Sequence, residues 1–385
     1  MHVLMVGPFP EDLDKPVGGV EAAITNLVVG LGRLPNVEVE VISNSVISGE
    51  RTVSHPFGSV TYIPQGPGFR GWASDLHGHL IREVRRRKAD VVHVQGLASV
   101  AARLPDSVLT VHGISERDIW ESGEGASRVV RFGGALLLEG IPRRTARRVI
   151  AISEHASKQI WHKSGSVWRI PNAIHPRYFS PNREVRRGNP NIFITAGAIL
   201  PIKNTAEVIT AFRQVAIAND GARLVLAGDG LDTCYGRQCV ELVDRLQLQQ
   251  HVTFLGQQSG AQIAELLFGA GTLVQFSTQE NAPMAVAEAL AAGAAVIGSD
   301  VGGIPGMLRD LPGCHVVPVG DTHSLACRLL ASATTEDETF SQHRHEAALQ
   351  YSPQTVSQQT LAVYREVAGT SAGRVGGERN RQEKE

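Results

Sequence analysis

The sequence predicts an α/β protein built from two doubly wound, Rossmann-like domains, and three observations support this fold class. The chain has 385 residues, more than one domain usually holds. Short apolar runs alternate with longer segments of helical periodicity, the order that builds parallel sheets with crossover helices. A polar stretch with two prolines, 180–190, separates two such series. We therefore expect one domain over 1–182 and a second over 191–352.

The first domain is expected to hold a helix at 19–33 and a series of buried strands. The opening run, MHVLMVGPFP, has only about six strand-like residues before Gly7, too few for a signal peptide or a membrane span. We expect it to form the first strand. The strands expected along this domain lie at 2–6, 37–42, 90–94, 107–111 and 148–152.

A second series of strands follows the linker, and a helix is expected near the end of the chain at 353–368. The segment after this helix, 369–385, is rich in glycine and charge and has no hydrophobic period, so we expect a disordered tail. The strands of the second domain are expected at 192–197, 223–228, 252–256, 272–277, 294–299 and 315–319.

Composition narrows the classes of function. Hydrophobic residues make up 42% of the chain and charged residues 19%, an ordinary globular balance. The net charge of -1 gives no overall field that would recruit nucleic acid. The four cysteines show neither a CxxC pair nor zinc-finger spacing, so we expect a reducing, cytoplasmic location and no structural metal.

Two glycines and a histidine are the candidate site residues of the first domain, because ligands of doubly wound sheets bind beyond the carboxyl ends of the strands. Gly18 and Gly19 precede a helix, where backbone N–H groups could approach a phosphate. A flexible turn is the alternative. His112 ends a strand in TVHG, and an ordinary hydrogen-bonded polar group is the alternative for it.

A lysine and a glycine turn follow the first two strands of the second domain. Lys203, in GAILPIKN, stands near the start of a helix and could neutralise a diphosphate, although a solvated surface lysine fits the same pattern. Gly228 closes the next strand in the turn GDG. Neither signal is specific alone.

The stretch STQENAPMAVAEALAAG, residues 277–293, carries two carboxylates in an apolar context. Pro283 suits the first turn of a helix, so we expect a helix from about 282 to Gly293, with Glu280 before it and Glu288 on it. The free N–H groups at the helix start favour an anion or sugar hydroxyls. The apolar neighbours of Glu288 predict a buried carboxylate, which needs a partner.

Together these motifs resemble the E-x7-E family of retaining GT-B glycosyltransferases. The resemblance is carried by STQENAPMAVAEALAAGAAVIGSDVGGIP and, in the family's order, by GGVE, DVVHV, TVHG, AISEHA, RIPNAI, GAILPIKN, LVLAGDG and VTFLG. It implies two domains facing each other across a cleft, with the last helix crossing back onto the first. It also implies transfer of a hexosyl group from a nucleoside-diphosphate sugar to an acceptor hydroxyl, with retained configuration and without a metal or other cofactor.

The resemblance gives the candidate residues implied roles. Glu288 would bind the nucleotide ribose, Lys203 would contact the diphosphate, and Glu280 would hold the donor sugar. His112 would lie beside the anomeric centre, so the implied catalytic residues are His112, Lys203 and Glu280. The other implied donor-binding positions are Gly18, Gly19, Gly228, Asn281, Ala282, Pro283 and Met284.

Two positions depart from the family's pattern. Ala198 stands where these enzymes usually carry an arginine, and Gly306 stands where they often carry a glutamate. Loss of a preorganised cation costs roughly 3 to 4 kcal/mol in the transition state. A catalytically weak nucleotide-sugar-binding subunit therefore stays an alternative. A second is a UDP-sugar epimerase of the same fold, which the E-x7-E context disfavours.

The acceptor expected from the resemblance is a sugar, a lipid-linked sugar or a polysaccharide, in polysaccharide, glycolipid or glycoconjugate synthesis. Basic residues cluster at 82–88 and 143–148. Solvated helix faces explain such clusters, and the alternative is peripheral contact with the inner face of an anionic membrane.

Overall fold

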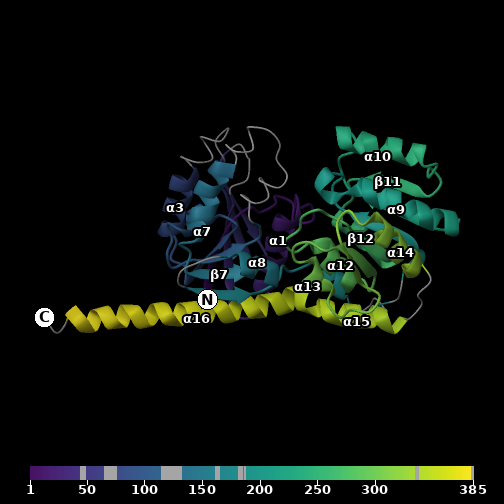
Figure 1. Ribbon diagram of the computed structural model, residues 1–385. Coiled ribbons are helices and arrows are strands. Elements are labelled where there is room, and N and C mark those ends of the chain that lie inside the picture. The colour runs from purple at the N-terminus through teal and green to yellow at the C-terminus, as the bar shows by residue number, and fades with distance from the viewer. Residues whose placement is uncertain are drawn as a thin grey trace. The chain divides into compact units, whose positions relative to one another are not determined.

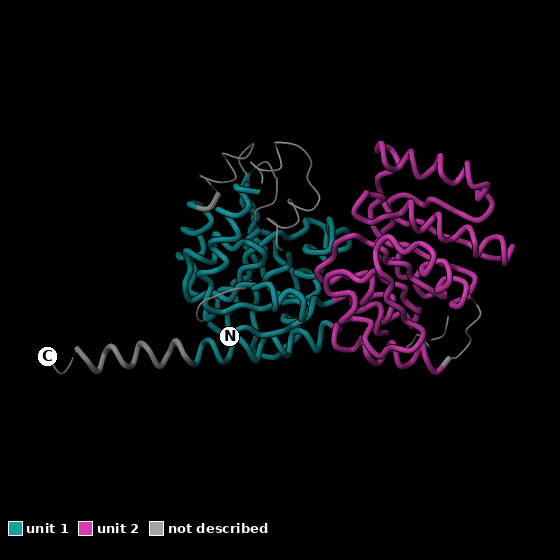
Figure 2. The backbone as a smooth tube through the Cα atoms, viewed as in Figure 1, with its two compact units in different colours: residues 1–173, 353–385 teal, residues 174–352 magenta. Residues whose placement is uncertain are grey.

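The computed structural model shows two compact units, one formed by residues 1–173 and 353–385 and the other by 174–352 (Figure 2). The boundary comes earlier than the predicted linker, because Ile174 and Tyr178 already belong to an apolar core of the second unit. Most of the predicted linker after residue 180 lies outside the described residues. The structure describes residues 1–43, 49–64, 76–113, 132–160, 165–180, 185, 188–333 and 338–382.

An eight-stranded sheet forms the centre of the first unit, in the order β3-β4-β2-β1-β5-β6-β7-β8. Among the strand pairs that the structure describes in this sheet, only β3–β4 is antiparallel. The five predicted strands of this unit are present, and β3, β4 and β8 are additions to them. The strands are β1 (His2–Val6), β2 (Glu38–Ser43), β3 (Arg51–His55), β4 (Gly58–Tyr62), β5 (Val91–Gln95), β6 (Val108–Val111), β7 (Arg148–Ala151) and β8 (Ser166–Arg169).

Helices pack on this sheet, and the last helix of the chain is one of them. Gly30 on α1 lies so close to Pro353 and Ser357 on α16 that a Cβ would clash, which brings the two helices into direct contact. The helices are α1 (Gly19–Leu31), α3 (Leu76–Arg86), α4 (Ala98–Ala101), α7 (Ile141–Arg143), α8 (Glu154–Gln159) and α16 (Pro353–Gln382).

The helix α16, yellow in Figure 1, continues beyond the predicted end at 368. The disordered tail expected over 369–385 stays a prediction, and 383–385 lie outside the described residues.

The second unit is a six-stranded, fully parallel sheet in the order β11-β10-β9-β12-β13-β14. All six predicted strands are present. Because the sheet is parallel, the segments that follow its strands all start from one edge. The strands are β9 (Asn189–Ala196), β10 (Arg223–Ala227), β11 (Val252–Gly256), β12 (Ala270–Gln275), β13 (Ala295–Ser299) and β14 (His315–Val317).

Helices cover both faces of the second sheet, each over its own apolar core (Figure 1). One core is shared with α9 (Thr205–Ala218), α10 (Cys234–Arg245) and α14 (Thr322–Ser332). The other is shared with α11 (Gly260–Gly269), α12 (Met284–Ala291), α13 (Ile304–Leu308) and α15 (Glu338–Ala348). Among the described residues, no helix has both the length and the apolar character needed to cross a membrane.

Candidate active site

Three loops at the carboxyl edge of the second sheet are joined to one another. The Thr278 N–H, after β12, donates to the Ile202 carbonyl at 2.8 Å, after β9. The Ser299 hydroxyl, at the end of β13, donates to the Ser277 carbonyl at 2.6 Å. Gly302 has φ +59° and lies against the Glu280 carbonyl, where no Cβ fits. These contacts fix the loops on either side of Glu280.

The Glu280 carboxylate is the centre of this loop cluster. Its Oε1 accepts from Lys203 Nζ at 2.5 Å and from Gln275 Nε2 and Ser277 Oγ at 2.8 Å each. The side chains of Glu280 and Lys203 are 11% and 32% exposed, so the pair is shielded but reachable from solvent. Three donors hold one oxygen, which leaves Oε2 as the free acceptor of a preorganised carboxylate.

The structure thus brings the predicted residues Lys203 and Glu280 together. Gln275 and Ser277 were not predicted as site residues, although both stand at the end of the apolar run TLVQFS. A polar side chain at the carboxyl end of a buried strand was the signal that could have identified them.

The helix α12 begins next to this cluster, two residues later than the predicted start at about 282. Pro283 is its N-cap, with an extended ψ of 122°, and Met284 is its first residue. Because its ψ is extended, Pro283 is not itself helical, and the helix starts with the next residue. The Pro283 carbonyl nevertheless accepts a hydrogen bond from the Val286 N–H at 3.2 Å, as an N-cap carbonyl does. No side chain caps this end. The first backbone N–H groups of α12, which follow the segment Asn281, Ala282 and Pro283, are therefore open to a ligand.

Glu288 lies one turn further along α12 and has the partner that the sequence requires. The Tyr178 hydroxyl hydrogen-bonds to it, and the Arg177 guanidinium lies close enough to favour its charged form. Burial outweighs both and raises the pKa of Glu288 to about 7. Neither Arg177 nor Tyr178, in the 3-10 turn Pro176–Phe179, was predicted, because their contact with α12 depends on packing between distant segments.

Replacing Glu288 by glutamine tests this burial. The folded pKa is raised, so stability is highest while the carboxyl is neutral and falls as pH rises from 4.5 through about 7. Relative to Glu288→Gln, the wild-type free energy of unfolding should therefore fall by up to about 3 kcal/mol between about pH 4.5 and about pH 8. Urea unfolding at several pH values measures the difference. Glu241→Gln, on an exposed position of α10, is the control, and a pH-independent difference at Glu288 would contradict the assignment.

Gly228 and Ala198 lie where the loops after β9 and β10 meet. A Cβ on Gly228 would overlap the Gly197 carbonyl and lie 3.0 Å from the Ala198 nitrogen, so only glycine fits. Lys203 Cε lies 3.9 Å from the place that a Cβ on Gly197 would take. The lysine side chain therefore passes directly beside the segment in which the family usually has its arginine.

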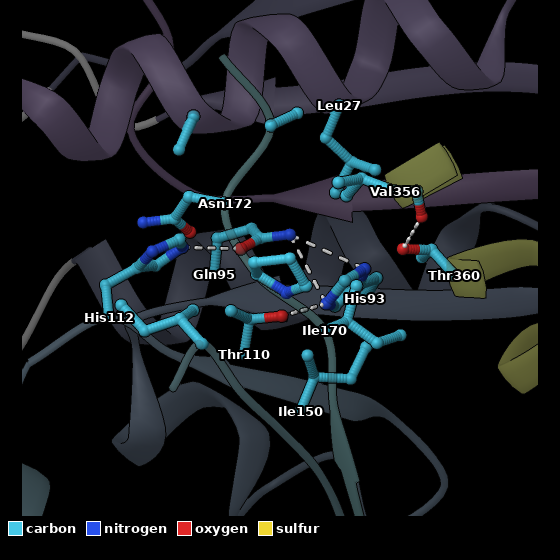
Figure 3. A pocket seen from close by; sticks show the side chains of 14 residues that line it. Leu27, His93, Gln95, Thr110, His112, Ile150, Ile170, Asn172, Val356 and Thr360 are labelled. Carbon is cyan, nitrogen blue, oxygen red and sulfur yellow. Dashed lines mark hydrogen bonds between the residues drawn. The ribbon is translucent and has the colours of Figure 1, made fainter. Parts of the chain in front are cut away.

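In the first unit, His112 follows β6 and lies at a small cavity of about 20 Å³ (Figure 3). Its Nε2 lies 2.7 Å from Gln95 Oε1, and its buried Nδ1 has no hydrogen-bond partner in the part of the chain that the structure describes. Burial lowers the pKa of His112 to about 4, and the Asn172 side chain, which lies near enough to favour the protonated ring, opposes this to a smaller extent. The ring is therefore neutral near pH 7, and it can offer a hydrogen-bond acceptor at the end of its strand.

Gly18 and Gly19 are also in the first unit, at the start of α1. Gly18 is the N-cap with φ +88°, a conformation that side chains other than glycine rarely adopt, and no group lies within 4 Å of its missing Cβ. The Val17 N–H donates to the Glu21 carboxylate at 2.7 Å, which ties this turn to the helix. The turn is thus shaped by glycine and open to one side.

Comparison with known proteins identifies both units. The model of Glycosyltransferase Family 4 matches residues 17–178, and that of Glycosyl transferases group 1 matches 177–346. Phosphatidyl-myo-inositol mannosyltransferase of Mycobacterium leprae is 25% identical over 97% of this chain and 99% of its own. N-acetyl-alpha-D-glucosaminyl L-malate synthase of Bacillus anthracis is 34% identical over 32% of this chain and 31% of its own.

Solved structures agree with this assignment of the fold. Sucrose-phosphate synthase of Thermosynechococcus elongatus has a TM-score of 0.76 at 18% identity, over 96% of this chain and 100% of that one. HepE of Anabaena, solved in complex with UDP, has a TM-score of 0.68 at 17% identity, over 95% and 100% of the two chains. The fold is GT-B, and the chain belongs to the glycosyltransferases that join a family 4 domain to a group 1 domain.

Proposed function

We propose that the protein is a retaining glycosyltransferase that moves a hexosyl group from a nucleoside-diphosphate sugar to a hydroxyl of a sugar, lipid-linked or polysaccharide acceptor. The observation that carries the proposal is the Lys203–Glu280 pair at the carboxyl edge of the second sheet, beside the open start of α12. A cation, free amides and a fixed carboxylate at one place suit a diphosphate joined to a sugar.

The proposed roles follow from these positions. The Lys203 ammonium and the first amides of α12 would bind the diphosphate and stabilise its negative charge as it leaves. The Oε2 atom of Glu280 would accept hydrogen bonds from donor-sugar hydroxyls. Glu288, further along the same helix, would accept from the ribose hydroxyls in its ionised form. Charge neutralisation by Lys203 and the helix needs no metal in this scheme.

The proposed reaction proceeds on one face of the sugar. The bond from the anomeric carbon to the phosphate oxygen breaks, the acceptor oxygen bonds to that carbon from the same side, and the acceptor proton passes to the leaving phosphate oxygen. No enzyme nucleophile is required. The three donors on Oε1 of Glu280 support this scheme, because they stabilise the carboxylate charge and make it a poor nucleophile.

Nucleoside-diphosphate release tests the proposal and separates it from a binding subunit. We expect release from at least one of UDP-glucose, UDP-N-acetylglucosamine and GDP-mannose with glycerol as a simple acceptor. EDTA should leave the rate unchanged, and the glycoside formed should keep the donor's anomeric configuration in its NMR spectrum. Calorimetric binding of a donor without turnover of any would favour the binding subunit, and an inverted product would contradict retention.

We also propose peripheral contact with anionic membranes through the basic segment 82–88, at the end of α3. Arg82, Arg85 and Lys88 are exposed along this segment, whereas Arg87 is paired with Glu40 and Glu83. Each exposed basic residue near a membrane surface contributes about 1 kcal/mol. We expect the protein to co-sediment with phosphatidylglycerol vesicles at low salt and the double variant Arg82→Glu, Arg85→Glu to bind less. Failure of the wild type to sediment at low salt would contradict the contact.

A further inference from the structure

We propose that Gln95 is a positioning residue that fixes the tautomer of His112, so that Nδ1 of this histidine is offered to a ligand as a hydrogen-bond acceptor. Gln95 ends β5 and is 1% exposed. Its Oε1 lies 2.7 Å from His112 Nε2, and its Nε2 lies 3.2 Å from the Met5 sulfur. Figure 3 shows the amide between the rings of His112 and His93.

The contacts of the Gln95 nitrogen determine which way the amide points. This nitrogen lies 3.5 Å from Nδ1 and 3.3 Å from Nε2 of His93. If the Gln95 nitrogen lay in the plane of the His93 ring at these two nearly equal distances, it would clash with Cε1, the carbon between Nδ1 and Nε2. The nitrogen therefore lies over the face of the ring. The face of a neutral ring and a thioether sulfur attract an N–H group and repel a carbonyl oxygen. The amide oxygen therefore points to His112.

His93 stays neutral in this arrangement. Its Nδ1 lies 2.6 Å from the Tyr364 hydroxyl of α16, and its Nε2 lies 2.6 Å from the Thr110 hydroxyl of β6. Burial and, to a smaller extent, the neighbouring His112 lower the pKa of His93 to about 3. The buried ring thus keeps its electron-rich face toward the Gln95 amide, and α16 contributes to holding it there.

The direction of the Gln95 amide determines which ring nitrogen of His112 carries the hydrogen. A carbonyl oxygen only accepts, so His112 Nε2 must carry the hydrogen, and a neutral ring then has its lone pair on Nδ1. The Asn172 side chain lies near enough to favour a protonated ring, but the buried Nδ1 makes no hydrogen bond among the described residues. It suits a ligand that brings a hydroxyl hydrogen. The identification of this ligand as the donor sugar rests on the proposed function, whereas the tautomer does not.

Two-bond ¹H–¹⁵N correlation spectra of the histidine rings at neutral pH test the tautomer directly. The signals of His112 are assigned as those that disappear in His112→Asn. We expect Nε2 protonated and Nδ1 unprotonated in the wild type. In Gln95→Met, which keeps the size but removes the acceptor, the Nδ1–H form should appear. Thr360→Val, at a residue that lines the same cavity and donates its hydroxyl hydrogen to the Val356 carbonyl, should leave the His112 signals unchanged.

A protonated Nδ1 in the wild type, or identical spectra for the wild type and Gln95→Met, would overturn the proposal. The wild-type spectrum decides even if Gln95→Met fails to fold. With UDP-glucose or another donor that is turned over, Gln95→Met should also lose about tenfold in kcat/KM, the effect of one hydrogen bond. A wild type with the expected tautomer but no turnover would refute the proposed function and leave the role of Gln95 intact.

Discussion

Replacing Lys203 by methionine is expected to lower kcat about 10²- to 10³-fold, because one preorganised charge that faces the leaving group contributes roughly 3 to 4 kcal/mol. Lys203 Nζ is 2.5 Å from Glu280, and its side chain passes beside the segment that carries Ala198. With alanine at the usual arginine position, the proposed mechanism leaves Lys203 to neutralise a larger share of the charge on the leaving diphosphate. Initial rates of nucleoside-diphosphate release measure the loss.

Two further variants accompany this experiment, one at the partner of Lys203 and one as a control. Glu280→Gln keeps the shape of the side chain but removes the charge that orients Lys203, so its kcat should also fall. Lys158→Met, on α8 of the first unit, removes a lysine that is 73% exposed and should leave the rate unchanged. A Lys203→Met enzyme with wild-type kcat would show that this ammonium does not face the leaving group.

Replacing Arg344 by methionine is expected to lower the free energy of unfolding by about 3 kcal/mol, because each buried acceptor left without a donor costs about 1 to 3 kcal/mol. Arg344 is 2% exposed. Its guanidinium donates to the Gly293 carbonyl at 2.7 and 3.0 Å and to the Pro312 carbonyl at 2.8 Å. Gly293 follows α12, so this arginine secures the end of the helix that carries Glu288.

Urea unfolding measures the effect of Arg344→Met. Arg245→Met, at an exposed position at the end of α10, is the matched control and should change the free energy of unfolding by less than about 0.5 kcal/mol. A loss at Arg344 no larger than that of the control would contradict the importance of these buried bonds.

The sequence was sufficient for the buried, apolar strands but not for the polar strands at the sheet edges. Strands such as β12 are buried on both faces and read as continuous apolar runs, which locates them without any tertiary information. The edge strands β3 and β8 are polar and largely exposed, so no hydrophobic period marks them. The strand β4 (Gly58–Tyr62) contains too few consecutive apolar residues to be recognised as a strand from the sequence alone.

The candidate site was predictable where residues directly follow strands. Lys203 and Glu280 follow neighbouring strands of one parallel sheet, and the topology therefore brings them to one edge. The partners of Glu288 were not predictable, because Arg177 and Tyr178 are more than a hundred residues away in sequence and reach α12 only through packing. The role of Gln95 likewise depends on the direction of one amide, which only its contacts reveal.

Nucleoside-diphosphate release by the wild type and by Lys203→Met, measured side by side with the same three donors, tests the central claim most directly. The account predicts release by the wild type from at least one donor and a rate lower by about 100-fold or more in the variant. Equal rates in the two proteins, or no release from any donor by the wild type, would contradict glycosyl transfer at the Lys203–Glu280 pair.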